Sequence, residues 1–225
     1  MSADNNSEVS FGLFDSHEDI DYSARSLPHW FQPGVAAFIT FRTTDSLPRA
    51  VIERWDDEQR QWLLRNGILV PNDLTTLQPE HLPAALRRRF RVYRDRRLHW
   101  HLDQCHGECL LRRPELAQIV ADALLHFDGD RYDLDRFVVM PNHVHLLAQF
   151  RPPTTLREQC RNWLHYSAVQ INRFIGRHGR FWQSEPFDHL LRSGRQFTHL
   201  RGYIKDNPEK AHLRAGEYLY WERPT

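Results

Sequence analysis

The sequence has 225 residues, of which 40% are hydrophobic and 26% charged, and its formal net charge is +1 at pH 7. This composition excludes a disordered chain, and the length suits one domain with an added segment or two small domains. No apolar run reaches the ~18 residues that a membrane-spanning helix needs, and residues 1–10 are too polar and acidic for a secretory signal. Three cysteines make no even disulfide framework, so we expect a cytoplasmic protein without a membrane anchor.

Basic residues gather toward the C-terminal end of the chain. Residues 1–60 hold five arginines against eleven acids, whereas residues 151–225 hold thirteen lysines and arginines against seven acids. Arginine dominates this excess, and its guanidinium favours bidentate phosphate contacts and stacking on bases. The asymmetry indicates a polyanion such as nucleic acid as the partner, with solvated helix faces as the alternative reading.

The N-terminal half combines one strand with helical segments. Residues 1–27 are polar and acidic and predict a mobile lead-in. Residues 35–43 are β-branched and aromatic and predict the first strand. A helix is expected over residues 48–65 and another over residues 72–102. Seven arginines between positions 87 and 97 could line nucleic acid or solvate the second helix.

A cluster of histidines and cysteines follows this helix. Its spacing is similar to that of zinc ligands, but it occurs once, and Gly107 indicates a turn instead. We therefore favour a turn beside the next helix over a zinc site. The members of the cluster are His99, His101, Cys105, His106 and Cys109.

The C-terminal half alternates strands and helices. Its expected elements are a helix over 114–127, strands over 132–140 and 143–150, a helix over 156–175, a strand over 187–192 and a helix over 196–207.

Without residues 47–112, the whole chain reads strand, helix, strand, strand, helix, strand, helix. This order predicts an α+β fold, a ferredoxin-like βαββαβ core with an antiparallel sheet and an added C-terminal helix. Residues 47–112 then form a helical insertion after the first strand. We expect a single domain over residues 28–213, followed by a tail over residues 214–225.

Two histidines stand two residues apart in one of these strands. Because a strand alternates its faces, His143 and His145 project from the same side. Two imidazoles on one face are half of a metal site, although they could also be half-exposed core residues. The last helix offers Tyr203 and Asn207 four residues apart, hence on one helical face. An amide oxygen beside imidazoles suits Mg²⁺ or Mn²⁺, which predicts a metal site with a tyrosine nucleophile next to it.

A second tyrosine competes for the role of nucleophile. Tyr166 lies in the long helix, where we interpret it as a packing or DNA-facing residue. Trp182 is interpreted as a core residue or as an anchor of the turn before the last strand. The prediction of a tyrosine site therefore depends on the last helix docking close to the strand that carries the histidines.

Three short motifs together resemble those of the single-tyrosine transposases. Residues 140–147 resemble their His-hydrophobic-His motif, residues 203–211 their tyrosine helix, and residues 181–189 with Arg192 the segment that precedes this helix. The Asn-Pro pair after the tyrosine is similar to the REP-associated tyrosine transposases, domesticated relatives that act on repeated palindromic sequences.

The resemblance covers residues 28–44 and 114–213 but not the helical insertion. Insertion-sequence members of the family usually carry glutamine where this chain has Asn207.

The resemblance implies a specific chemistry. His143, His145 and Asn207 would hold Mg²⁺ or Mn²⁺ at the scissile phosphate of a single DNA strand. Tyr203 would attack this phosphate, leaving a 5′-phosphotyrosine and a free 3′-OH, and a second 3′-OH could then resolve the link. The enzyme would thus be an endonuclease and strand transferase acting on single-stranded or hairpin DNA near the nucleoid.

Several residues and alternatives accompany this reading. Arg192, Arg201 and Lys205 are candidate DNA-binding residues, and the last two could also activate the phenol. The alternative function is a domesticated, non-catalytic DNA-binding protein, against which the intact Tyr203 and histidine pair argue. Monomer or homodimer, cis or trans tyrosine, the hairpin recognised, the role of the insertion and whether the element is mobile or domesticated all stay open.

Overall fold

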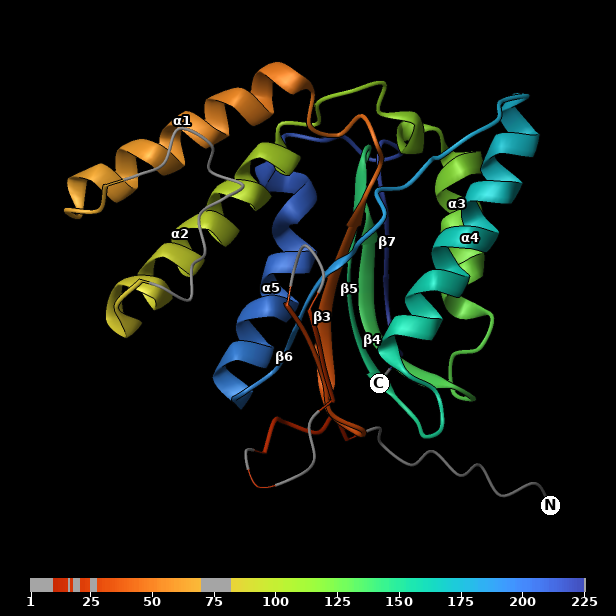
Figure 1. Cartoon of the computed structure of the whole chain (residues 1–225). Helices are drawn as coiled ribbons and strands as arrows, with labels where there is room; N and C mark the ends of the chain where they lie inside the picture. Colours follow the sequence, from red (N-terminus) through yellow and green to blue (C-terminus); the bar gives the residue numbers. More distant parts are fainter. Residues whose placement is uncertain (1–9, 16, 18–20, 25–27, 70–81, 225) are drawn as a thin grey trace. The chain divides into compact units, whose positions relative to one another are not determined.

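The chain forms two compact units in the computed structural model, drawn in Figure 1. One unit comprises residues 1–44 and 109–225, and the other comprises residues 45–108. The structure describes residues 10–15, 17, 21–24, 28–69 and 82–224.

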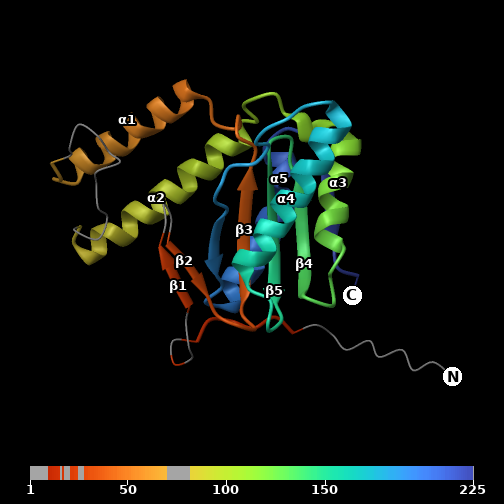
Figure 2. The ribbon, with the colours of Figure 1, turned by 45° about the vertical axis from the view of Figure 1, so that its right-hand side comes forward.

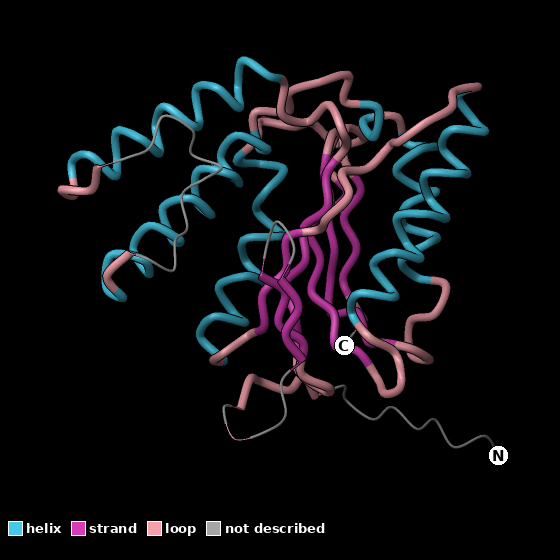
Figure 3. Tube along the Cα trace, viewed as in Figure 1, coloured by secondary structure: helices cyan, strands magenta, loops and turns pink. Residues whose placement is uncertain are grey.

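The first unit is built on one five-stranded sheet with the order β6-β3-β5-β4-β7, in which every neighbouring pair is antiparallel. Figure 3 draws its strands in magenta. The bounds are β3 (Ala36–Arg42), β4 (Tyr132–Val139), β5 (His143–Phe150), β6 (Phe187–Leu190) and β7 (Leu219–Glu222). A separate hairpin, visible in Figure 2, pairs β1 (Asp21–Ala24) with β2 (Pro28–Phe31).

Three α-helices cover the two faces of this sheet. α3 (Pro114–Leu125) and α4 (Leu156–Ile175) lie on one face, and α5 (Gly194–Lys210) lies on the other (Figure 1). A short 3₁₀ helix, η3 (Leu110–Arg112), precedes α3. The order β3-α3-β4-β5-α4-β6 with a following helix confirms the predicted ferredoxin-like βαββαβ core.

Local signals explain where α4 and α5 begin and end. Thr155 and Ser193 cap them, each accepting a hydrogen bond from the backbone N–H three residues on. α4 ends at Gly176, which adopts the left-handed conformation with φ 67°. The predicted end of the last helix at residue 207, just before Pro208, was wrong, because α5 includes Pro208 and runs on to Lys210. Proline lacks a backbone N–H and so removes one hydrogen bond of the helix, which costs little stability this close to the helix end.

Each face of the sheet has its own hydrophobic core. On the side of α3 and α4, Trp163 donates its indole N–H to Tyr132 Oη at 3.0 Å, and Tyr132 donates to the Leu124 carbonyl at 2.7 Å. Burial raises the pKa of Tyr132 to about 12. Trp182 belongs to the same core and donates to Ser167 Oγ at 2.9 Å, as its interpretation as a core residue requires. On the other side, Ile204 of α5 packs into a second core.

The C-terminal residues contribute to the sheet. β7 lies within residues 214–225 and pairs with β4 from Arg136↔Glu222 to Val139↔Leu219. The buried Arg136 donates to Asp135 at 2.7 Å and to Tyr220 Oη at 3.1 Å. The segment expected as a tail therefore includes an edge strand.

The second unit contains α1 (Arg49–Arg65) and α2 (Ala84–Asp103). Trp62 of α1 stacks on Tyr93 of α2 at 5.4 Å between ring centroids, and Arg97 binds the Glu58 carboxylate through two nitrogens at 2.8 and 2.6 Å. The predicted start of the second helix at residue 72 lies outside the described residues. No described helix is long and apolar enough to cross a membrane.

The histidine and cysteine cluster gains no support as a zinc site. Among the described residues, none of its five members belongs to a group of three clustered His, Cys, Asp or Glu ligand atoms. His101 instead packs edge-on against Trp55 and Trp100 and lies 3.6 Å from the Glu58 carboxylate. Burial lowers the pKa of His101, so this ring is a packed, neutral member of the second unit.

Leu146, fully buried in β5, is expected to carry much of the stability of the first unit. Leu146→Ala should lower the free energy of unfolding by about 2–5 kcal/mol, because it leaves a cavity between the sheet and its helices. The matched change Val169→Ala on α4, where the side chain is 48% exposed, should stay within about 0.5 kcal/mol of wild type. Urea denaturation followed by circular dichroism checks both values, and equal losses would contradict this assignment of the core.

Candidate metal and tyrosine site

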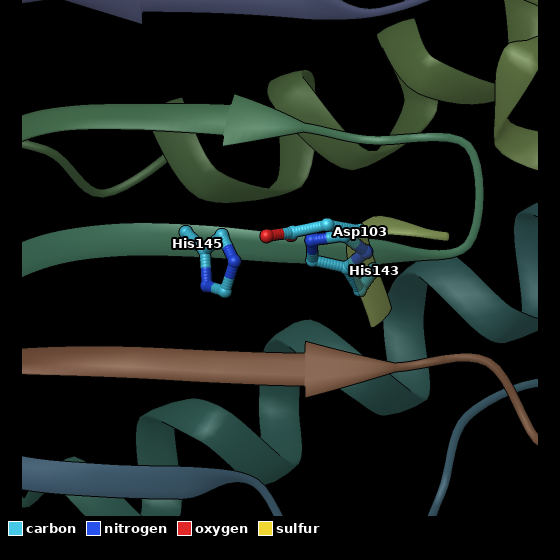
Figure 4. Close-up of side chains that lie close together, drawn as sticks. All are labelled: Asp103, His143 and His145. Carbon is cyan, nitrogen blue, oxygen red and sulfur yellow. The ribbon is translucent and has the colours of Figure 1, made fainter. Parts of the chain in front are cut away.

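His143 and His145 rise from the same face of β5, as strand alternation predicts (Figure 4). Their ring centroids are 4.6 Å apart, and each ring offers a ligand nitrogen within 4.8 Å of the other. Both residues are buried. Asp103, also labelled in Figure 4, belongs to α2 of the second unit.

A side-chain oxygen lies within hydrogen-bonding distance of the Nδ1 atom of each imidazole. His143 Nδ1 lies 2.7 Å from Asn142 Oδ1, and His145 Nδ1 lies 2.7 Å from Thr40 Oγ1. An amide oxygen only accepts hydrogen bonds, so the proton of His143 sits on Nδ1 and the lone pair on Nε2. Such outer contacts orient histidines that bind metals and set their tautomer.

Tyr203 of α5 contacts one of these histidines. Its Oη lies 3.2 Å from His145 Nε2, and the two rings meet at 62° with centroids 5.2 Å apart. The phenol donates to Nε2 when His145 carries its proton on Nδ1 and donates that proton to Thr40 Oγ1. Phe38 stacks on His145 at 5.4 Å and meets the Tyr203 ring edge-on at 6.0 Å, which holds both rings in place.

Contacts on either side of Tyr203 dock α5 on the sheet. Two residues before it, Arg201 Nε lies 3.2 Å from the buried carboxylate of Asp135 on β4. The next residue, Ile204, is fully buried. One turn further on, Asn207 is fully buried as well, on the helical face that Tyr203 shares. The docking on which the tyrosine site depends is therefore present in the structure.

The lysine that contacts Tyr203 is one that the sequence analysis missed. Lys210 Nζ lies 5.6 Å from the centroid of the Tyr203 ring. Lys210 follows Tyr203 by seven residues, which is close to two helical turns, whereas Lys205 points away because two residues turn a helix by about 200°. Both Arg201 and Lys210 have a carboxylate partner, Asp135 at 3.2 Å and Asp206 at 3.9 Å, but Lys210 is the one that also contacts the Tyr203 ring. Helical periodicity, rather than proximity along the chain, would have identified Lys210.

Two residues of β3 complete the surroundings of the histidines. β3 pairs with β5 so that Thr40 is opposite His145 and Arg42 is opposite His143. Because directly opposite residues in an antiparallel pair share a face, Arg42 projects on the same side as the histidines. Burial lowers the pKa of Arg42. The sequence analysis missed both, since strand register is not encoded locally.

The remaining candidates lie in other surroundings. Arg192 is exposed and its guanidinium carbon lies 5.4 Å from the centroid of Phe14. Lys205 is exposed on α5. Tyr166 has an amide, Gln170, four residues on, as Tyr203 has Asn207, so spacing alone does not separate the two tyrosines. The positions of the two tyrosines in the fold do separate them. Tyr166 is on α4, whereas the histidines contact α5, on the opposite face of the sheet (Figure 1).

Comparisons with known proteins add one distant structural likeness. The sequence matches no protein-family model and no curated protein. The fold is similar to that of a REP-associated tyrosine transposase whose structure was solved bound to a REP hairpin. The likeness has a TM-score of 0.42 at 15% identity and covers 81% of this chain and 71% of the other. At this level it assigns no function to the chain.

His189 on β6, next to Phe38, is expected to stay uncharged to low pH. Burial, and then the charge of Arg192, lower the pKa of His189 to about 4, whereas an exposed histidine titrates near ~6.5. Between these values the unfolded chain binds a proton that the folded protein excludes. The contribution of His189 to stability is therefore complete above pH ~6.5 and is lost as the pH falls toward 4.

An NMR titration of the His189 ring checks this expectation. The midpoint should lie at about 4, and His189→Phe should flatten the acid side of the stability profile. A midpoint at the ordinary histidine value would contradict the assignment.

Proposed function

We propose that this protein nicks and joins single DNA strands in a metal-dependent reaction that passes through a 5′-phosphotyrosine on Tyr203. The observation that carries the proposal is the 3.2 Å contact between Tyr203 Oη and His145 Nε2. This contact places a tyrosine hydroxyl next to a pair of histidines. The Nδ1 atoms of both histidines already contact side-chain oxygens, which leaves their Nε2 atoms to bind a metal. This is the arrangement expected of a metal site with an attacking group beside it.

The donor atoms fit a divalent ion. His143 and His145 would bind through Nε2, because their Nδ1 atoms face Asn142 and Thr40. The buried Asn207 on α5 would add an amide oxygen. Imidazoles with a hard oxygen suit Mn²⁺, and Mg²⁺ with water as additional ligand. When bound, such an ion would supply Lewis-acid polarisation of the scissile phosphate.

The residues of the chain perform the remaining steps. Tyr203 Oη attacks phosphorus, so that an O–P bond to the tyrosine forms and the bond from phosphorus to the 3′ oxygen breaks. The phenol gives up its proton, and the departing 3′ oxygen gains one. In the reverse reaction a 3′-OH attacks the phosphotyrosine, restores a phosphodiester and releases Tyr203. The energy of the original bond is retained in the covalent link, so no further energy source is required.

The phenol needs help to react near neutral pH, since a tyrosine ordinarily titrates near ~10. His145 Nε2 would hold the metal in the reacting complex, so the proton of the phenol passes to water. The ammonium group of Lys210, 5.6 Å from the ring, favours the phenolate electrostatically, and the Asp206 carboxylate, 3.9 Å from Nζ, offsets part of this effect. Arg42 shares a face of the sheet with His143, and its guanidinium would attract the phosphate charge.

Hairpin or palindromic repeat DNA is the proposed substrate, and the proposed place of action is the cytoplasm, on nucleoid DNA. This step rests on the resemblance of residues 140–147 and 203–211 to the REP-associated tyrosine transposases. The Tyr203–His145 contact lies within one chain, which supports a tyrosine acting in cis. We further propose that residues 28–213 act as one transposase-like domain with the helical insertion included in it.

Tyr203→Phe is expected to abolish covalent attachment to DNA, because it removes the attacking oxygen and little else. Wild-type protein with Mn²⁺ and a labelled single-stranded hairpin should give an adduct that survives denaturing electrophoresis, and EDTA should prevent it. Tyr166→Phe is the matched control and should form the adduct as wild type does. An adduct that persists in Tyr203→Phe would show that another residue is the nucleophile.

Thr40→Val is expected to weaken metal binding by about 10–100-fold, because it removes the hydroxyl that holds His145 Nδ1 while keeping the side-chain shape. Calorimetric titration with Mn²⁺ measures this in the absence of DNA. Thr198→Val, at an exposed position of α5, is the control and should bind as wild type does. If Thr40→Val and Thr198→Val bind Mn²⁺ with equal affinity, Thr40 does not support the metal site.

A further inference from the structure

Exposed aromatic side chains gather on the outer face of α4. Among the described residues of the first unit, four large hydrophobic side chains are exposed, and three of them are Tyr166 at 53%, Val169 at 48% and Phe174 at 54%. Tyr166 and Phe174 are about 12 Å apart along the helix axis, enough for each ring to take a separate partner. Isolated exposed hydrophobics are ordinary, whereas such a group on one helix marks an interaction surface.

A hollow lies between these rings and the neighbouring helix α3. It is open to solvent, has a volume of about 420 Å³ and is lined by Ile119, Asp122, Tyr166, Gln170, Arg173 and Phe174. This size falls in the range of small-ligand sites, and the mixture of ring faces with a few polar groups is typical of them. Gln170 and Asp122 could form hydrogen bonds with the edge of a planar ligand.

An arginine without a carboxylate partner lies beside these rings. Arg173 lines the hollow and, within the described part of the chain, forms no ion pair. Other arginines of the basic C-terminal segment are neutralised, as Arg201 is by Asp135. The exposed acid at the start of α4, Glu158, accepts a hydrogen bond from the Thr155 hydroxyl at the helix cap.

One more cation lies against this surface. The guanidinium carbon of Arg113 lies 5.5 Å from the Phe174 ring centroid, and its Nε lies 4.0 Å from the exposed Glu115 carboxylate. The surface therefore combines aromatic faces with positive charge.

We infer that this face of α4 binds single-stranded nucleic acid, with bases stacked on Tyr166 and Phe174 and phosphates held by Arg173 and Arg113. Every base has a π-face, so stacking on aromatic rings with arginines along the backbone gives binding that tolerates many sequences. α4 lies on the opposite face of the sheet from α5, which carries Tyr203 (Figure 1). Binding at this surface goes beyond the proposed reaction and needs neither a metal nor the nucleophile.

Fluorescence anisotropy with a labelled oligothymidylate of about 20 nucleotides tests this surface, because such a probe forms no hairpin and covers at least one ordinary single-strand site. EDTA in the buffer prevents nicking. Tyr166→Ala and Phe174→Ala should each weaken binding about fivefold or more, whereas Tyr166→Phe, which keeps the ring, should bind as wild type does. Arg173→Gln should reduce the slope of log affinity against log salt by about 0.7, the value for one phosphate contact on a single strand.

Arg195→Gln is the charge-matched control, because Arg195 is exposed on α5 across the sheet. It should leave the affinity unchanged. Unchanged affinity in Tyr166→Ala, Phe174→Ala and Arg173→Gln would overturn the proposal. So would a self-association, measured by sedimentation, that Tyr166→Ala abolishes while DNA affinity stays the same, since a second copy of the chain would then occupy the surface.

The test is separate from that of the reaction. Tyr203→Phe should retain full affinity for the oligothymidylate even where it forms no adduct. Loss of the adduct therefore bears on the reaction, and loss of affinity in the α4 variants bears on this surface.

Discussion

The pairing register of β3 with β5 is the constraint on which the candidate site depends. It sets Thr40 opposite His145 and Arg42 opposite His143. Because side chains alternate along a strand, a slip of one residue would turn these partners to the other face, into the core with α3 and α4. That core, with Leu146 and Val144 pointing into it, opposes such a slip. The buried apolar residues on one face of β5 thus fix which residues of β3 lie opposite the histidines on the other face.

The docking of α5 is the second requirement, and it rests on contacts outside the reacting groups. The Arg201–Asp135 pair and the buried Ile204 hold the helix on the sheet. The Asp135 carboxylate is buried but the Arg201 side chain is 41% exposed, so the pair positions the helix without adding large net stability. Tyr203 stands between these two contacts, and its ring position follows from them together with its edge-on contact with Phe38.

Sequence reasoning predicted those parts of the site that follow from the local periodicity of a strand or a helix. Strand alternation placed His143 and His145 on one face, and helical spacing placed Tyr203 and Asn207 on another. It missed Thr40 and Arg42, because pairing between strands a hundred residues apart leaves no local signal. It also preferred Lys205 to Lys210 by counting along the chain instead of around the helix. The element order predicted the fold, because βαββαβ admits few sheet topologies.

Cations lie beside aromatic rings on both faces of the sheet. On the α5 face, Lys210 lies 5.6 Å from the Tyr203 ring and is paired with Asp206 at 3.9 Å. On the α4 face, Arg113 lies 5.5 Å from the Phe174 ring and is paired with Glu115 at 4.0 Å, and Arg173 lines the same hollow. A weak, exposed ion pair is readily exchanged for contact with a polyanion, because water already screens most of its attraction. Under the two proposals, nucleic acid would therefore compete with these carboxylates on each face.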